Sequence, residues 1–232
     1  MGDNLYVLST SPLPMPLVNK AAEAGMVIDS IPFIRIEAVT DNGIKEELEE
    51  FAGLPLTAVF TSANAVRAVA EAIQSAGPAW NIYCVGNATT NEALERFGNC
   101  FISGTANDAA TLAGIIITHD VQEVVFFCGD KRMDTLPGLL LAEEISVYEV
   151  VVYKTIETPQ VATKAYDGIL FFSPSGVNSF FKVNTIGAST VLFAIGNTTV
   201  GAIKELSGNK VVVSEAPSKE DLVDKVMEYF HK

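Results

Sequence analysis

The chain has 232 residues, 49% of them hydrophobic, which is enough for one large or two small hydrophobic cores. Its 15 basic and 28 acidic residues give a net charge of −13, which argues against nucleic acid or an anionic membrane as a partner. No apolar run approaches the ~20 residues of a membrane span, and the first residues lack the layout of a signal peptide, so we expect a cytoplasmic protein.

Apolar runs of strand length alternate with stretches of helical periodicity along the chain. The runs are rich in β-branched and aromatic residues and lack clean two-residue alternation, as is typical of strands covered on both faces. The intervening stretches repeat apolar residues at helical spacing, as at Val66, Val69 and Ile73. The predicted strands cover residues 5–9, 56–61, 82–85, 123–128, 147–153, 169–172 and 191–195. This alternation predicts an α/β fold with parallel sheets of about five strands each.

The second half of the chain repeats motifs of the first half. Val85-Gly86-Asn87-Ala88-Thr89 returns as Ile195-Gly196-Asn197-Thr198-Thr199, an offset of 110 residues. Upstream, Val59-Phe60-Thr61-Ser62 returns as Phe171-Phe172-Ser173-Pro174 at nearly the same offset. A period of this length indicates two copies of a domain, not a solenoid of short repeats.

A second repeat runs out of step with the first and indicates how the domains are connected. Residues 4–36 resemble residues 122–153, so the chain alternates between two kinds of unit. The two middle units are contiguous, and we predict that they form one inserted domain over residues 37–155. The outer units then form a discontinuous domain of residues 1–36 plus 156–232. Each domain is expected to be a flavodoxin-like parallel α/β sheet, with two chain crossings between the domains.

Four polar turns follow predicted strands and open helices. They are Thr61-Ser62-Ala63-Asn64, Gly86-Asn87-Ala88-Thr89, Ser173-Pro174-Ser175-Gly176 and Gly196-Asn197-Thr198-Thr199. One interpretation is that their hydroxyl and amide side chains only cap the helices. The other is a ligand site, because open α/β sheets bind ligands at the carboxyl ends of their strands, and helix N-termini suit carboxylates or phosphates. None of the turns has a Walker or dinucleotide-binding spacing, which disfavours nucleotides.

Cysteine and histidine usage excludes several kinds of chemistry. Cys84, Cys100 and Cys128 are odd in number and lie in apolar strands, so we expect buried free thiols in a reducing compartment. Because His119 and His231 are the only histidines, we expect no catalytic triad, histidine-rich metal site or histidine acid–base catalysis. No exposed apolar stripe demands an oligomer, so a monomer is expected. An enzyme of this composition would work mainly by holding its substrate in shape.

The chain resembles the uroporphyrinogen-III synthase family over essentially its whole length. The resemblance is carried, in order, by Phe60–Val66, Val85–Thr89, Val150–Thr155, Phe172–Val177 and Ile195–Thr199. It implies two α/β lobes joined by a two-stranded connector. The chain departs from the family at Ser11-Pro12, where an Arg-Pro turn is usual. This departure leaves that turn of the first lobe without a basic anchor.

The resemblance also implies a reaction: linear hydroxymethylbilane loses water, inverts its terminal D ring and closes to uroporphyrinogen III without a cofactor. Tyr153 ends a predicted strand and matches a tyrosine that the family retains, so it is the candidate to hydrogen-bond the departing hydroxyl. The alternative for Tyr153 is an aromatic residue packed at the connector. Because substrate and protein are both anionic, the N–H groups of the four turns are expected to bind the carboxylates, aided by Lys131 and Arg132. For these two basic residues, the alternative is an exposed loop without function.

The candidate residues therefore fall into a catalytic and a substrate-binding set. Tyr153 is the catalytic candidate, and no metal ligand is expected. The substrate-binding candidates are Thr61, Ser62, Ala63, Asn64, Gly86, Asn87, Ala88, Thr89, Lys131, Arg132, Ser173, Ser175, Gly176, Val177, Asn197, Thr198 and Thr199. The competing hypothesis is a non-catalytic, synthase-like module that binds a tetrapyrrole or regulates another protein.

Overall fold

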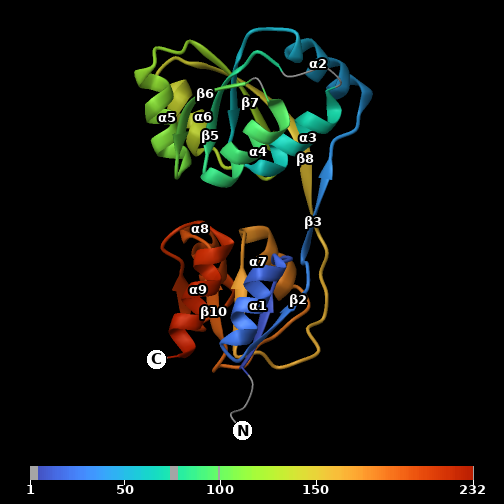
Figure 1. Ribbon diagram of the computed structural model, residues 1–232, viewed down its shortest axis with the longest axis vertical. Coiled ribbons are helices and arrows are strands. Elements are labelled where there is room, and N and C mark those ends of the chain that lie inside the picture. Colours follow the sequence, from blue (N-terminus) through green and yellow to red (C-terminus); the bar gives the residue numbers. More distant parts are fainter. Residues whose placement is uncertain (1–4, 74–77, 99, 232) are drawn as a thin grey trace. The chain divides into compact units, whose positions relative to one another are not determined.

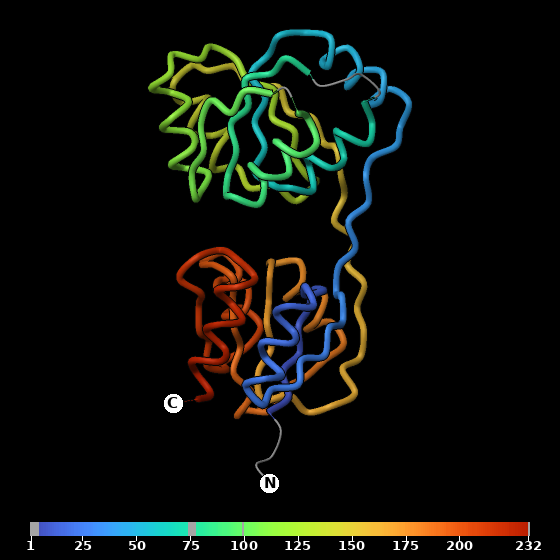
Figure 2. Tube along the Cα trace, viewed as in Figure 1, coloured from blue at the N-terminus to red at the C-terminus, as the bar shows by residue number. Residues whose placement is uncertain are grey.

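The computed structural model describes residues 5–73, 78–98 and 100–231, and the chain divides into two compact units (Figure 1). Unit 1 combines residues 1–35 with residues 156–232, and unit 2 is the intervening segment 36–155. Both the beginning and the end of the chain thus belong to unit 1, as the blue and red segments of Figure 2 show.

Unit 1 is built on a parallel sheet with the strand order β11-β10-β9-β1-β2. Its strands are β1 (Leu5–Ser9), β2 (Met26–Ser30), β9 (Gly168–Phe171), β10 (Val191–Ala194) and β11 (Val211–Val213). Its helices are α1 (Met15–Glu23), α7 (Pro174–Phe181), α8 (Asn197–Leu206) and α9 (Lys219–Phe230). Adjacent strand residues point to opposite faces, so Val7 packs with α1 and α9, whereas Leu8 packs with α7 and α8.

Unit 2 contains a sheet with the strand order β3-β8-β7-β4-β5-β6. Its strands are β3 (Ile34–Ala38), β4 (Thr57–Phe60), β5 (Asn81–Val85), β6 (Phe101–Ala106), β7 (Glu123–Gly129) and β8 (Ser146–Glu157). Its helices are α2 (Asn42–Ala52), α3 (Ala63–Ala72), α4 (Asn87–Phe97), α5 (Ala109–Thr118) and α6 (Thr135–Ala142). The ladders from β8 through β6 are parallel. Phe60 packs with α2, α3 and α4 on one face, and Val59 packs with α5 and α6 on the other.

The α/β fold with parallel sheets that the sequence predicts is confirmed. The predicted strands match the observed bounds to within one residue, with a single exception. The exception is β8, which continues to Glu157, so its predicted end at Tyr153 is wrong. The strand is longer because β3 lies beside β8 in the sheet and offers its backbone groups hydrogen-bond partners.

The three cysteines are free thiols. Cys84 and Cys128 are buried in β5 and β7, as expected. Cys100 is only half-buried and precedes β6, so its predicted place within a strand is wrong. Burial raises the pKa of Cys84 to about 12 and that of Cys128 to about 11. Both thiols are therefore protonated at neutral pH, and this makes them poor nucleophiles.

Candidate active site

Three of the predicted site segments meet at one edge of the unit 2 sheet. The strands β7, β4 and β5 are parallel neighbours in that order. Their carboxyl ends therefore lie at the same edge, where open α/β sheets bind ligands. The chain that follows these ends carries residues 61–64, 86–89 and 131–132. Segments far apart in the sequence are thus brought together by the strand order alone.

The helices that follow β4 and β5 begin in different ways. Ser62 caps α3, because its Oγ accepts a hydrogen bond from the N–H of Asn64 at 3.2 Å. The helix α4 begins after Gly86, whose φ of +80° favours glycine, and no side chain caps it within the described contacts. The interpretation of the turns as side-chain caps therefore holds for Ser62 but not at Gly86. The first N–H groups of α4 are left to interact with water or an anion.

Tyr153 lies inside β8 and its side chain packs against the core of unit 2. Burial raises the pKa of its phenol, and a hydrogen bond with the Ser62 side chain acts in the opposite direction. The phenol is therefore protonated at neutral pH and lies beside the residue that caps α3. The sequence placed Tyr153 at a strand end, whereas its position beside Ser62 comes from the pairing of β7 with both β8 and β4.

Arg132 is occupied by two carboxylates of its own unit. Its guanidinium forms ion pairs with Asp134 and Glu149, and these contacts raise its pKa. Asp130, in the same turn, accepts a hydrogen bond from the N–H of Thr155 at 2.8 Å. A carboxylate ligand would have to displace Asp134 or Glu149 to reach Arg132. Lys131 is exposed in this turn.

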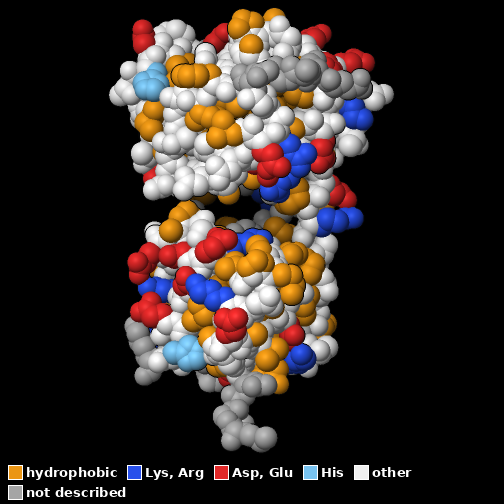
Figure 3. Space-filling view, in the orientation of Figure 1, with side chains coloured by type: hydrophobic (Ala, Val, Ile, Leu, Met, Phe, Trp, Pro, Cys, Tyr) orange, Lys and Arg blue, Asp and Glu red, His pale blue; other side chains and the backbone are white. Residues whose placement is uncertain are grey.

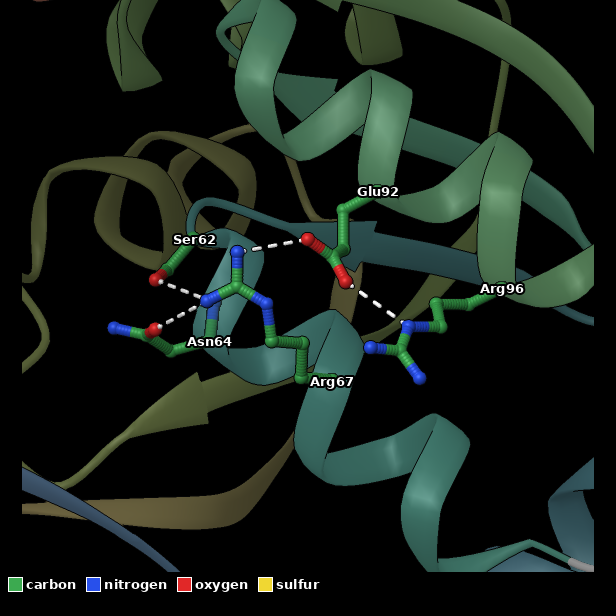
Figure 4. A network of polar contacts seen from close by, with 5 residues as sticks. All are labelled: Ser62, Asn64, Arg67, Glu92 and Arg96. Carbon is green, nitrogen blue, oxygen red and sulfur yellow. Dashed lines mark hydrogen bonds and ion pairs between the residues drawn. The ribbon is translucent and has the colours of Figure 1, made fainter. Parts of the chain in front are cut away.

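A second basic group, which sequence reasoning missed, lies beside the Ser62 turn (Figure 4). Arg67 donates from Nη1 to Oδ1 of Asn64 at 3.2 Å and from Nη2 to Oε2 of Glu92 at 2.7 Å. Arg96 donates from Nε to the other carboxylate oxygen of Glu92 at 3.0 Å. Arg67, followed by Arg96, lowers the pKa of the Glu92 carboxyl. One signal in the sequence could have found this residue: Arg67 lies three residues, about one helical turn, after Asn64 in the helix that Ser62 caps.

The corresponding turns of unit 1 follow β9 and β10, which are parallel neighbours. Ser173 caps α7, because its Oγ accepts a hydrogen bond from the N–H of Gly176 at 3.1 Å. The helix α8 begins after Gly196 and, like α4, has no side-chain cap within the described contacts. Of the two predicted turns in each unit, one therefore carries a side-chain cap and the other leaves its helix N-terminus uncapped.

Burial decides which predicted side chains in these turns can touch a ligand. Thr89 and Thr199 are buried at equivalent positions, and Val177 belongs to the hydrophobic core. Gly176 is buried as well, so these residues can offer a ligand only backbone groups. The remaining substrate-binding candidates in the four turns are half-buried or exposed: Thr61, Ser62, Ala63, Asn64, Gly86, Asn87, Ala88, Ser173, Ser175, Asn197 and Thr198.

The turn that lacks the family's arginine has another cation beside it. Lys219, the first residue of α9, donates from Nζ to the carbonyl oxygen of Pro12 at 2.6 Å. Its ammonium also lies 5.6 Å from the centroid of the Phe172 ring. The sequence did not predict this contact, because 207 residues separate the two partners.

The surface charge agrees with a predominantly acidic protein. On the face shown in Figure 3, acidic side chains are spread over both units, and basic side chains gather in a few patches. Within residues 5–73, 78–98 and 100–231, no three His, Cys, Asp or Glu side chains gather as ligands for a metal ion. Across the same residues, no helix has the length and apolarity needed to cross a membrane.

Comparison with known proteins gives one consistent family. The family model of uroporphyrinogen-III synthase HemD matches residues 16–224. A uroporphyrinogen-III synthase of Saccharomyces cerevisiae is 29% identical over an alignment of 176 residues, and the match covers 64% of this chain. The matched segment also spans 64% of the length of the yeast protein.

Two solved structures share the fold of nearly the whole chain. A uroporphyrinogen-III synthetase of Helicobacter pylori has a TM-score of 0.68 at 15% identity and covers 97% of this chain and 99% of its own. A mutant uroporphyrinogen III synthase of Thermus thermophilus has a TM-score of 0.63 at 16% identity and covers 98% of both chains. At such low identity, these similarities concern the fold alone.

Proposed function

The chain belongs to the uroporphyrinogen-III synthase family, and on this basis we propose that it closes linear hydroxymethylbilane to uroporphyrinogen III. The reaction loses water and inverts the terminal D ring. The observation that carries the proposal is the pair of helices that start side by side after neighbouring parallel strands in each unit, α3 and α4 in unit 2 and α7 and α8 in unit 1, of which α4 and α8 have no side-chain cap. Such N-termini bind carboxylates through backbone N–H groups and the helix dipole.

Carboxylate binding by backbone groups suits both the substrate and the charge of the protein. The substrate has eight carboxylates, and the protein has a net charge of −13, so overall charge opposes binding. Attraction must then come from local donors, such as the N–H groups of residues 87–89 and 197–199. Local donors also fix the substrate in one conformation. Holding the two ends of a chain together supplies effective molarities of about 10⁵ M or more.

Tyr153 is the residue that we assign to the loss of water. Burial raises the pKa of its phenol, so the phenol carries a proton at neutral pH and donates it toward the departing hydroxyl. The hydrogen bond with Ser62 fixes the phenol beside the N-terminus of α3. The dipole of that helix stabilises negative charge that develops there during the reaction.

The two units are, in this proposal, two flavodoxin-like domains over residues 1–36 plus 156–232 and residues 37–155. Counted from β1 in unit 1 and from β7 in unit 2, both sheets follow the order 2-1-3-4-5 of flavodoxin-like folds. The strands β3 and β8, which are neighbours and cross the unit boundaries, would serve as the connector. We further propose a monomer in the cytoplasm, a compartment that keeps the three thiols reduced.

A coupled assay tests the activity directly. Freshly generated hydroxymethylbilane is added to the protein, the products are oxidised, and porphyrin isomers I and III are separated by chromatography. We expect a large excess of isomer III over the isomer I that forms spontaneously. Isomer I alone, produced in the presence of folded protein, would exclude the synthase and favour the non-catalytic tetrapyrrole-binding module. Gel filtration with light scattering measures the molar mass in solution and so tests whether the protein is a monomer.

A further inference from the structure

We propose that Arg67 binds a carboxylate of the substrate at the edge of the unit 2 sheet, in the role that the sequence suggested for Arg132. This inference rests on the proposed function, because it assigns one binding contact of that reaction. It is carried by the position of Arg67 between the Ser62–Asn64 turn and Glu92 (Figure 4).

Arg67 and Arg132 differ in the net charge of the ion-paired group to which each belongs. Arg132 faces the two carboxylates of Asp134 and Glu149, so that group has an excess negative charge. Arg67 shares the single carboxylate of Glu92 with Arg96, so this group has an excess positive charge. An anionic ligand is therefore attracted to the group around Glu92 and repelled by the group around Arg132.

Arg67 also has donors left for a ligand. A guanidinium has five N–H donors in a planar fork, and a fork of this kind matches a carboxylate with two parallel hydrogen bonds. Within the part of the chain that the structure describes, Arg67 uses one N–H of Nη1 and one of Nη2 for hydrogen bonds. The Arg67 side chain is 46% exposed, whereas that of Glu92 is only 13% exposed. The half-buried carboxylate of Glu92 holds the guanidinium in place, and the guanidinium remains partly exposed to solvent.

The location of Arg67 fits the helix N-termini that bind carboxylates in the proposed function. It stands on α3, and Glu92 stands on α4, about 7.5 Å along the helix axis from Asn87. The strands that lead into these helices are parallel neighbours. The uncapped start of α4, where a substrate carboxylate would bind, and the Arg67 guanidinium thus lie at the same edge of the sheet.

The alternative role for Arg67 is a purely structural clamp between α3 and α4. Arg96 is the matched control for this role, since it pairs with the same carboxylate but lies one turn beyond Glu92, further from the start of α4 at Asn87. Arg67→Gln and Arg96→Gln each remove one ion pair to Glu92. We expect similar losses of thermal stability in both variants, and thermal unfolding checks this expectation.

Steady-state kinetics with hydroxymethylbilane distinguish the two roles. Loss of a charge-assisted hydrogen bond to the substrate predicts that Arg67→Gln raises KM about 10-fold or more, with a smaller change in kcat. Arg67→Lys keeps the charge but loses the planar fork, so its KM should lie in between. Arg96→Gln should change KM less than about 3-fold, because it leaves Glu92 paired with Arg67 alone. Equal KM values in Arg67→Gln and Arg96→Gln would overturn the proposal and leave the clamp.

A binding experiment keeps this proposal separate from the proposed function. Uroporphyrin III, an octacarboxylate, is titrated with each variant and followed by its fluorescence. We expect weaker binding to Arg67→Gln than to Arg96→Gln, and increasing salt should reduce this difference. If wild type makes isomer III but both variants bind uroporphyrin equally well, the role of Arg67 is refuted and the proposed function is not. Absence of isomer III from wild type would refute the synthase, and the titration would still test Arg67.

Discussion

The ring of Tyr153 lies directly over Gly129, so that a Cβ added at Gly129 would stand 2.4 Å from Cζ of the tyrosine. The two residues are opposite each other because the register between β7 and β8 shifts at this point: Cys128 pairs with Val151, but Gly129 pairs with Tyr153. The irregularity inserts Val152 and turns the tyrosine toward the end of β7. Gly129 is therefore required for the close approach of the ring.

We predict that Gly129→Ala displaces the Tyr153 ring and reduces isomer III formation. Two ring carbons and the phenol oxygen would lie 2.4 to 2.7 Å from the new methyl group, and such overpacking costs about 1–3 kcal/mol in unfolding free energy. The control is Gly114→Ala on the exposed face of α5, where an added Cβ meets nothing within 4 Å. The control should unfold at an equal or higher temperature. Full turnover in Gly129→Ala would contradict the requirement for this ring position.

Tyr153→Phe should slow turnover by about 10²-fold while KM changes little, since it removes a proton donor from the reacting hydroxyl. The ring, its packing and the approach to Gly129 all remain, so unfolding free energy should change by less than about 1 kcal/mol. Chemical denaturation and the isomer assay on the same preparation check both numbers. Turnover equal to wild type would assign Tyr153 to packing alone.

The pKa of Tyr153 has a consequence for pH dependence. Burial raises it above the ordinary value near 10, so the phenol stays protonated in the folded protein when unfolded tyrosine already ionises. The group then stabilises the fold fully below pH 10 and progressively less as pH rises through the folded pKa. We expect unfolding free energy to fall more steeply above pH 10 in wild type than in Tyr153→Phe. Identical slopes would contradict the raised pKa.

The sequence predicted the sheets of this protein better than its site. Parallel strands buried on both faces are apolar runs with sharp ends, so periodicity located them to within one residue at β1, β4, β5, β7, β9 and β10. The end of β8 was missed because a neighbouring strand, β3, prolongs it, and pairing between distant segments leaves no local pattern. Arg132 was predicted to bind substrate because it is a basic residue that follows a predicted strand. Its pairing with Glu149 depends on tertiary structure, as does the approach of Arg67 to Glu92.

Ser62→Ala tests the link between the helix cap and the phenol. Loss of the N-cap predicts a decrease of about 1 kcal/mol in unfolding free energy, and loss of the hydrogen bond to Tyr153 predicts slower turnover as well. Asp41→Ala is the control, because Asp41 caps α2 of the same unit by accepting from Gly43 N–H at 2.9 Å. It should lose similar stability with turnover unchanged. Equal turnover in both variants would show that the hydrogen bond between Ser62 and Tyr153 does not contribute to catalysis.

Glu92→Gln should destabilise unit 2 at neutral pH but not in acid. The arginines, Arg67 foremost, lower the pKa of the Glu92 carboxyl, so the folded state binds its proton less readily than the unfolded state, in which glutamate titrates near 4.3. The contribution of the ion pairs is therefore present above pH 4.3 and is lost as pH falls through the folded pKa. We expect Glu92→Gln to lose about 1 kcal/mol at pH 7.

Urea unfolding of wild type and variant at pH 7 and at successively lower pH measures this difference. Glu95→Gln, an exposed carboxylate on the same helix, is the control and should change unfolding free energy by less than about 0.5 kcal/mol throughout. Because Glu92 also orients Arg67, Glu92→Gln should raise KM for hydroxymethylbilane, whereas Glu95→Gln should not. A stability difference that stays constant down to pH 3 would show that packing of the Glu92 side chain, and not its charge, joins α3 to α4.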